Sequence, residues 1–360
     1  MTSHERFQAT LNKQRPDRLM LDLIWPRKET LDLLGRHFNT ESKDVILEKL
    51  GVDFRWVPMG ESYPEYEKKV TGTLEGNAPG AGKKYIFRDS MTFEDEWGIV
   101  QRVGDDGRYV EWNNGPLAGK ETLEGWSVPE VVFPDMESVR ETLAPHKNSV
   151  TVLDVPFPFK IAWHICGLEH FLMQMALSPE FVNQLYDQIY EFVSRKAVLG
   201  AKAGFDVIAV VGDLAGQNGM MFSTEMFGRF DLPRFTRLVD AIKKANSEVK
   251  VLYHSDGNME AVIPQLIQCG VDIVNPIQTA CMDPIAIKEK YGDKITLHGT
   301  ISVQDTIPNG SVEDVRNEVI HRIEKVGYNG GLVISPENSI PYNAPLENVL
   351  AVYETVRSYK

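Results

Sequence analysis

From residue 150 onward, apolar strand-like segments alternate with amphipathic helical segments, and this alternation restricts the folds that the chain can adopt. The strand-like segments are Val150–Val155, Val207–Gly212, Val249–Tyr253, Asp272–Asn275, Ile295–Leu297 and Gly331–Ile334. The helical patterns between and after them are Pro179–Lys202, Thr224–Asn246, Met259–Gln268, Pro284–Tyr291 and Val312–Gly327. Nearly continuous apolar strands that alternate with helices indicate a parallel sheet buried on both faces.

Two earlier segments, Leu19–Leu23 and Phe54–Val57, raise the number of predicted strands to eight. Eight parallel strands are typical of a (β/α)8 TIM barrel, which is therefore the expected fold. The alternative is a doubly wound open sheet. That fold usually carries a glycine-rich first turn for a dinucleotide, and no such turn follows the first strand here.

Residues 60–135 have a different character. The segments KYIFRDSM, EWGIVQRV and RYVEW are aromatic and rich in β-formers, and a Gly-Asp-Asp-Gly turn occurs at 104–107. We expect an antiparallel, β-rich insertion at about 60–135 within a barrel domain that occupies residues 1–360.

The composition limits the classes of partner that we expect for this chain and the compartment in which we expect it. The chain has 38 basic and 51 acidic residues, a net charge of −13, which disfavours non-specific nucleic-acid binding. No apolar run approaches the ~20 residues that span a bilayer, and the polar N-terminal segment lacks the apolar region of a secretory signal. Three cysteines do not make a disulfide framework. We expect a cytoplasmic protein with neither nucleic-acid nor membrane partners.

Polar side chains lie at or directly after the ends of nearly all the predicted strands, where the active site of a parallel barrel is built. In chain order they are Asp22, Asp154, Asp213, Gln217, His254, Asp256, Asn275, Gln278, His298, Thr300, Ser335, Glu337 and Asn338. The alternative interpretation is helix capping, which we prefer for Asn275, Thr300 and Ser335. Histidine is not a favoured cap, so His254, taken with Asp213 and Asp256, predicts a metal site or a general acid/base pair.

A second group of candidates lies in the segment AWHICGLEHFLMQMAL. Glu169 is a candidate ligand, whereas His164 and His170 are better interpreted as structural histidines. Trp163 is a candidate for the pocket wall. Cys166 has no CxxC partner, so a thiolate zinc site is not indicated.

The chain resembles the uroporphyrinogen decarboxylase superfamily over nearly its whole length. The resemblance lies in RFQATLNKQRPDRL, GLEHFLMQMALSPEFV, DLAGQNGMMFSTEMFGRFDLPRF, HSDGNMEAVIPQLIQCGVDIVNPIQ, LHGTISVQ and ISPENSIPYNAPLENVLAVYE. It implies a (β/α)8 barrel and one of two activities. These are cofactor-free decarboxylation of the acetate arms of uroporphyrinogen, or zinc-assisted methyl transfer involving a corrinoid protein.

Departures from both family patterns favour the second activity. The decarboxylases carry an arginine-rich segment after the first strand, and this chain has only Arg27 and Lys28 there. The thiol-alkylating methyltransferases bind zinc through His-x-Cys and a distant Cys. His254 matches their histidine, but Asp256 replaces the first cysteine and Asn338 stands near the second. The resemblance therefore implies a Zn²⁺ site with nitrogen and oxygen ligands, which suits an O- or N-methyl substrate.

We expect a corrinoid-dependent methyltransferase that demethylates a small methylated compound, for example an aryl methyl ether, and passes the methyl group to a corrinoid partner protein. The expected metal ligands are His254, Glu169 and Glu337; the expected catalytic residues are Asp213, Asp256 and Asp22; and the expected substrate-binding residues are Trp163, Gln217, Gln278, His298 and Asn338. Dimers are common in the superfamily, so a homodimer is expected. The alternatives are a cofactor-free decarboxylase or lyase with Asp22 or Asp213 as the acid, and a non-catalytic small-molecule binding protein.

Overall fold

The computed structural model describes residues 1–359, and its central feature is a parallel sheet of eight strands, as the sequence predicts. The strands are β1 (Met20–Leu21), β2 (Phe54–Trp56), β8 (Val150–Pro156), β9 (Val207–Val211), β12 (Lys250–His254), β13 (Ile273–Asn275), β14 (Thr296–His298) and β15 (Leu332–Ile334). From β2 to β15 each of these strands pairs in parallel with the next in chain order, and β15 pairs with β1, so β1 and β2 stand at the two ends of the sheet. The backbone N–H of Asp53 donates to Leu21 O at 2.8 Å and links β1 to β2, so the sheet is a nearly closed TIM barrel.

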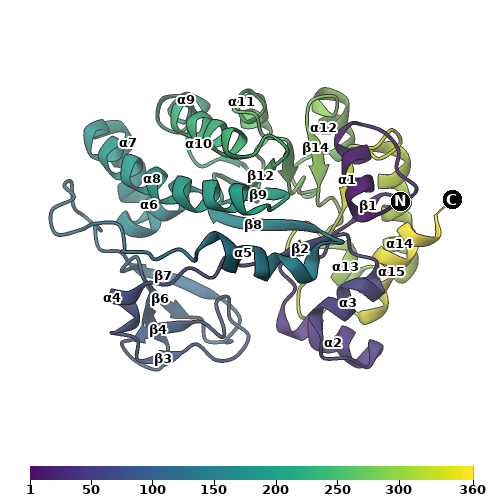
Figure 1. The fold of residues 1–360 in the computed structure, drawn as a ribbon, viewed down its shortest axis with the longest axis horizontal. Helices are drawn as coiled ribbons and strands as arrows, with labels where there is room; N and C mark the ends of the chain where they lie inside the picture. The colour runs from purple at the N-terminus through teal and green to yellow at the C-terminus, as the bar shows by residue number, and fades with distance from the viewer. Residues whose placement is uncertain (360) are drawn as a thin grey trace.

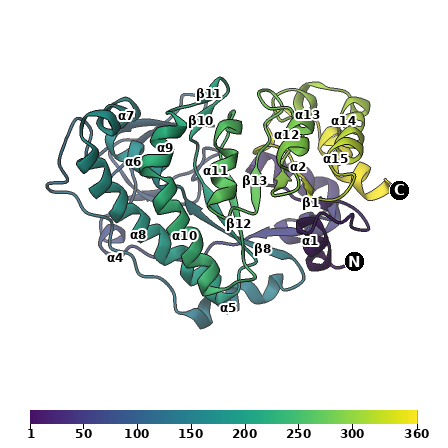
Figure 2. The ribbon, with the colours of Figure 1, turned by 90° about the horizontal axis from the view of Figure 1, so that it is seen from above.

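Helices surround the barrel (Figure 1). They are α1 (Ser3–Leu11), α2 (Lys28–Phe38), α3 (Lys43–Leu50), α5 (Met136–Leu143), α6 (Pro158–Cys166), α7 (Leu168–Leu177), α8 (Pro179–Ala203), α9 (Thr224–Phe230), α10 (Leu232–Ala245), α11 (Ile263–Gln268), α12 (Pro284–Tyr291), α13 (Thr306–Asn309), α14 (Val312–Lys325) and α15 (Leu346–Ser358). In Figure 2, α8 and α10 lie side by side on the outer face. None of the helices in residues 1–359 is both long enough and apolar enough to cross a membrane.

The helix predicted at Thr224–Asn246 is divided in two, which corrects the sequence interpretation. Helix α9 ends at Phe230, Asp231 follows, and α10 begins at Leu232 with Pro233 in its first turn. Proline has no N–H for the hydrogen bond of a continuous helix, and its ring clashes with the preceding turn. The chain therefore starts a new helix at this point.

Two apolar layers stabilise the barrel. Inward-facing side chains such as Phe54, Ala209 and Leu252 fill its interior, and a larger layer packs the strands against the helices. A filled interior is the usual state of an eight-stranded barrel, so the ligand site of such a protein lies at the ends of the strands and not inside the sheet.

The predicted β-rich insertion is present between β2 and β8. It is an antiparallel sheet in chain order, formed by β3 (Gly72–Thr73), β4 (Lys84–Phe87), β5 (Thr92–Glu94), β6 (Val100–Val103) and β7 (Val110–Asn114), with the short helix α4 (Pro64–Glu67) beside it. Figure 1 shows this sheet to one side of the barrel, beneath α6. Ser62 and Val132 form an antiparallel bridge with N–H···O distances of 3.0 and 2.9 Å, so the two ends of the insertion lie together.

The insertion is attached to α6 through its backbone. Leu117 N donates to Ile165 O at 3.0 Å, and Trp112 Nε1 donates to His164 O at 2.6 Å. A Cβ at Gly115 would lie 2.1 Å from Ile165 O, so only glycine permits this approach.

Candidate metal and substrate site

Asp213, His254 and Asp256 meet at the carboxyl ends of β9 and β12. One ligand atom from each lies within 4.8 Å of the others, and His254 Nε2 is 3.9 Å from an oxygen of each carboxylate. The two strands pair in parallel with Val211 opposite His254, so the residues that follow both strands emerge at the same edge. The local structure therefore brings together the three residues that the sequence singled out at these strand ends.

A left-handed turn follows Asp256 and fixes its backbone beside Asp213. Gly257 has φ +83°, and a Cβ there would lie 2.6 Å from the backbone of Gly216. Asp256 N donates to Asp213 Oδ1 at 2.9 Å, and Gly257 N donates to Gln278 Oε1 at 2.7 Å. Residues two apart on a strand share a face, so His254 and Asp256 start on the same side of the chain, and the hydrogen bonds of the turn hold Asp256 beside Asp213.

The two carboxylates have different electrostatic environments. Asn338 Nδ2 donates to Asp256 Oδ2 at 2.6 Å, and Lys160 Nζ lies 3.5 Å from Asp213 Oδ2. Burial acts to raise the pKa of Asp213, but the charges of Lys160 and His254 outweigh it and the pKa is lowered. Burial and the neighbouring Asp213 charge raise the pKa of Asp256. Two carboxylates in such proximity favour a cation between them.

The donor set fits a divalent metal. One imidazole nitrogen and two carboxylate oxygens are ligands that zinc accepts, and three protein ligands leave a position for substrate, as in catalytic zinc sites. His254 Nε2 faces the carboxylates, while Nδ1 lies 2.5 Å from Asn275 Oδ1, which is the usual outer partner arrangement of a metal-binding histidine.

Behind His254, a buried hydrogen-bonded chain runs to Asp22. Asn275 Nδ2 lies 2.7 Å from His298 Nδ1, and His298 Nε2 lies 3.1 Å from Asp22 Oδ2. Asn275 therefore bridges two histidines, and the interpretation of this residue as a helix cap was wrong. His298 is fully buried and its ring nitrogens contact Asp22 and Asn275, so these contacts occupy the side chain that we predicted to bind substrate.

The other predicted site residues differ in whether they contact the group of Asp213, His254 and Asp256. Gln278 contacts the turn at Gly257, and both Gln278 and Gln217 donate to Gln304 Oε1, at 3.0 and 3.2 Å. Trp163 is half-buried on α6. Glu169 is exposed at the start of α7, and Glu337 is buried with Oε1 accepting from Thr279 N at 2.6 Å. The structure does not bring either glutamate into the group of Asp213, His254 and Asp256.

Sequence reasoning missed Lys160 and Trp25. Lys160 lies in the first turn of α6, directly after β8, and Trp25 follows the first strand. The Trp25 ring lies edge-on to His254, with centroids 4.7 Å apart. Their positions after predicted strands are the signal that would have found both residues.

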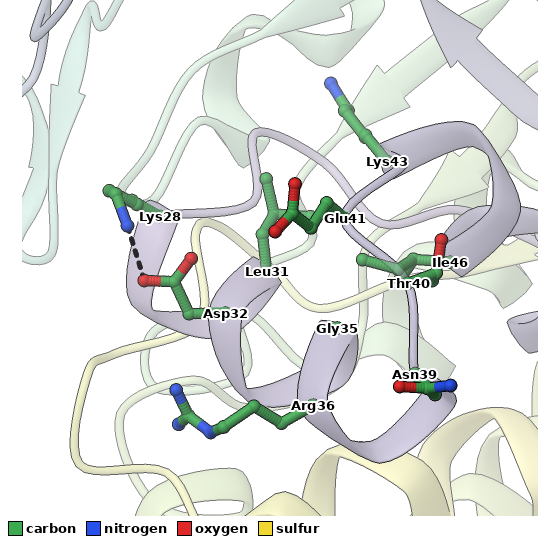
Figure 3. Close-up of a pocket in the computed structure, with 10 residues that line it drawn as sticks. All are labelled: Lys28, Leu31, Asp32, Gly35, Arg36, Asn39, Thr40, Glu41, Lys43 and Ile46. Carbon is green, nitrogen blue, oxygen red and sulfur yellow. Dashed lines mark hydrogen bonds and ion pairs between the residues drawn. The ribbon is translucent and has the colours of Figure 1, made fainter.

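A cavity of ≈ 1130 Å³ lies between the insertion and the barrel and reaches Lys160, the residue that contacts Asp213. The aromatic residues in its lining include Tyr63, Tyr85 and Trp97. A smaller pocket of ≈ 730 Å³ lies between α2 and α3 and shares no residue with the site (Figure 3). Among its charged side chains, Lys28 and Asp32 form a local ion pair at 2.5 Å, as Figure 3 shows.

Comparisons with known proteins agree with this architecture. The sequence profile described as "Uroporphyrinogen decarboxylase (URO-D)" matches residues 133–359. A methylated-thiol–coenzyme M methyltransferase of Methanosarcina mazei is 25% identical over 197 residues, which is 54% of this chain and 49% of that protein, so the match spans about half of the relative's length. The solved structure of a methyltransferase from Methanosarcina mazei superposes with a TM-score of 0.71 at 18% identity, covering 100% of this chain and 99% of that one. That superposition shows a common fold.

Proposed function

Because the chain belongs to the uroporphyrinogen decarboxylase family, we propose that it is a methyltransferase that takes a methyl group from a small methylated compound and passes it to a corrinoid on a partner protein. The methyltransferase of Methanosarcina mazei that is 25% identical to this chain supports methyl transfer as the reaction class. The donors near His254 support a metal-assisted form of that reaction. The proposal includes the homodimer expected from the family.

The observation that carries the proposal is the convergence of three donor atoms within 4.8 Å at the carboxyl end of the barrel. Asp213, His254 and Asp256 would hold the metal, for which zinc is our proposal. Bound zinc would supply Lewis acidity toward the heteroatom that carries the methyl group. This assignment replaces Glu169 and Glu337 as ligands, because their side chains lie outside the group.

Neighbouring side chains fix the orientation of these donors. Asn338 holds one oxygen of Asp256 and leaves the other facing His254. Lys160 pairs with the outer oxygen of Asp213. Trp25 packs against the His254 ring, which is 3% exposed, and limits its rotation. Groups held in this way are oriented before a ligand arrives, which lowers the cost of binding it.

The substrate class that we propose is an aryl methyl ether. The ligand set contains two carboxylates and no thiolate, and an oxygen-rich set makes zinc a harder Lewis acid, suited to an ether oxygen. The adjacent cavity, with Tyr63, Tyr85 and Trp97 in its lining, offers room and apolar surface for an aromatic ring. The methyl group needs an acceptor, and we propose that this acceptor is a corrinoid carried by a partner protein.

Metal content is the first test. The purified protein is dialysed against zinc sulfate and then against metal-free buffer, and bound zinc is measured by elemental analysis. We expect one equivalent in the wild type, a large loss in His254→Ala, and full retention in His321→Ala, whose histidine is exposed on α14. Absence of zinc from the wild type, or equal zinc in His254→Ala, would contradict the metal site.

Methyl transfer is the second test. Reduced cob(I)alamin replaces the partner protein, methoxybenzenes serve as donors, and loss of the cob(I)alamin absorbance reports transfer. We expect zinc-dependent turnover that His254→Ala abolishes and His321→Ala keeps. Turnover that is unchanged after zinc removal would refute the proposed role of the metal.

A further inference from the structure

In the buried hydrogen-bonded chain behind His254, the donors and acceptors cannot be exchanged, because some of its groups can only donate and others can only accept. It runs from Asp22 through His298 and Asn275 to His254, over distances of 3.1, 2.7 and 2.5 Å. Each histidine in its neutral form has one nitrogen that donates and one that accepts, and the partners decide which is which.

The direction is set at the Asp22 end. Leu23 N donates to Asp22 Oδ1 at 2.7 Å, and Trp56 Nε1 donates to Asp22 Oδ2 at 3.0 Å. A backbone N–H and an indole N–H can only donate, so both oxygens of this carboxylate serve as acceptors. His298 Nε2 must therefore carry a hydrogen toward Asp22, and Nδ1 of His298 is left as an acceptor.

Asn275 transmits the same direction. Its Nδ2 lies 2.7 Å from His298 Nδ1 and 3.3 Å from the carbonyl oxygen of His298, which can only accept. These two acceptors hold the NH₂ group on the side of His298, so Oδ1 faces His254. A Cβ at Gly299 would lie 2.6 Å from Asn275 Nδ2, so glycine at this position leaves the space that the amide occupies.

We infer that Asp22, His298 and Asn275 are positioning residues that hold His254 as the Nδ1–H tautomer and so present the lone pair of Nε2 to the space between Asp213 and Asp256. Without them, the two carboxylate oxygens at 3.9 Å would favour a hydrogen on Nε2, which is the form that cannot ligate a metal. The metal-binding consequence rests on the proposed function, whereas the tautomer itself does not.

The tautomer is measured directly in the wild-type protein, and a variant serves only to assign the signals. In metal-free protein labelled with ¹⁵N-histidine, at alkaline pH, two-bond ¹H–¹⁵N correlations show which ring nitrogen carries the hydrogen. The His254 signals are assigned by their loss in His254→Gln. We expect hydrogen on Nδ1 of His254 and on Nε2 of His298. Hydrogen on Nε2 of His254 would overturn the inference, whatever the protein does with zinc.

Variants test the consequence for metal binding, measured by competition for zinc with a fluorescent chelator. Asn275→Leu removes the hydrogen bonds to His254 and to His298, and we expect the His254 tautomer to shift and the affinity for zinc to fall about 10- to 100-fold. Asn275→Asp keeps an oxygen acceptor for His254 Nδ1, so we expect it to retain the tautomer and to restore most of the affinity. Asn348→Leu is the control, since Asn348 is also buried and its side-chain amide donates to the backbone carbonyls of residues 307 and 310.

The outcomes separate this inference from the proposed function. Unchanged zinc affinity in folded Asn275→Leu would overturn the positioning role, and so would an equal loss in Asn275→Asp or Asn348→Leu. A wild-type protein that binds no zinc would contradict the proposed function, while the tautomer measurement would still decide for or against the inference.

Discussion

Asp231 provides a sharp test of how burial acts on a charge in this barrel. Its side chain lies at the break between α9 and α10, is fully buried, and accepts hydrogen bonds from the hydroxyls of Tyr186 and Tyr190 at 3.3 and 3.1 Å. Burial raises the pKa of Asp231 from 3.8 to about 7, although both tyrosines and the charge of Arg234 act to lower it. The folded protein therefore holds a proton on Asp231 over a pH range in which the unfolded chain has lost it.

The sign and size of the effect follow from this difference. Between about pH 4 and pH 7 the folded state binds one more proton at Asp231 than the unfolded state, so the contribution of this residue to the unfolding free energy falls as pH rises. One pKa unit corresponds to roughly 1.4 kcal/mol, so a shift from 3.8 to about 7 corresponds to about 4 kcal/mol across the range.

The assay is urea unfolding of the wild type and of Asp231→Asn at half-unit intervals from pH 4 to 8. The variant cannot ionise at this position, and subtracting the two curves removes the contributions of all other groups. We expect the stability difference, wild type minus variant, to fall by about 4 kcal/mol as pH rises. Tyr190→Phe removes a hydrogen bond that lowers the pKa, so it should move the upper end of this range to higher pH. Parallel wild-type and Asp231→Asn curves would refute the reasoning.

Three further predictions address other parts of the fold. Gly257→Ala forces a left-handed residue to carry a Cβ that lies 2.6 Å from Gly216, so zinc affinity should fall at least about 10-fold by chelator competition; unchanged affinity would contradict the role of this turn. In the wild type the guanidinium of Arg18 lies 2.8 Å from a buried oxygen of Asp53. Asp53→Ala removes this carboxylate partner, so the free energy of unfolding in urea should fall by about 3–5 kcal/mol. The exposed Asp17→Ala should cost only about 0–1 kcal/mol, and equal losses would refute the distinction. Gly115→Ala would place a Cβ 2.1 Å from Ile165 O, so limited proteolysis should cut residues 60–135 faster than in the wild type, and equal rates would count against tight docking.

The sequence was sufficient for the barrel because its signal is repeated. Eight apolar segments separated by helical patterns predict the same architecture even where single boundaries fail, as at Leu19–Leu23, of which only Met20–Leu21 is a strand. The break at Asp231 was missed because an amphipathic pattern continues through it, and Pro233 was the available signal.

The site was harder to predict from the sequence than the fold, because it depends on the direction of individual side chains. The sequence placed Asp213, His254 and Asp256 near one another, but the exact position of Asp256 also depends on the left-handed turn at Gly257 and its hydrogen bonds. Glu337 also follows a strand, yet one carboxylate oxygen binds a backbone N–H at Thr279 instead of joining the group. Spacing in a sequence does not distinguish these two results, because the turn conformation and the local hydrogen-bond donors decide them.

The bridge between Ser62 and Val132 has an evolutionary consequence. Since the insertion leaves and rejoins the barrel at neighbouring points, it can lengthen, shorten or be exchanged without changing the register of the parallel strands. It also supplies Tyr66 and Tyr85 to the cavity, whereas Asp213, His254 and Asp256 come from the barrel. Under the proposed function, mutation of the insertion would change which compounds the cavity accepts, while the donors at the strand ends stay the same.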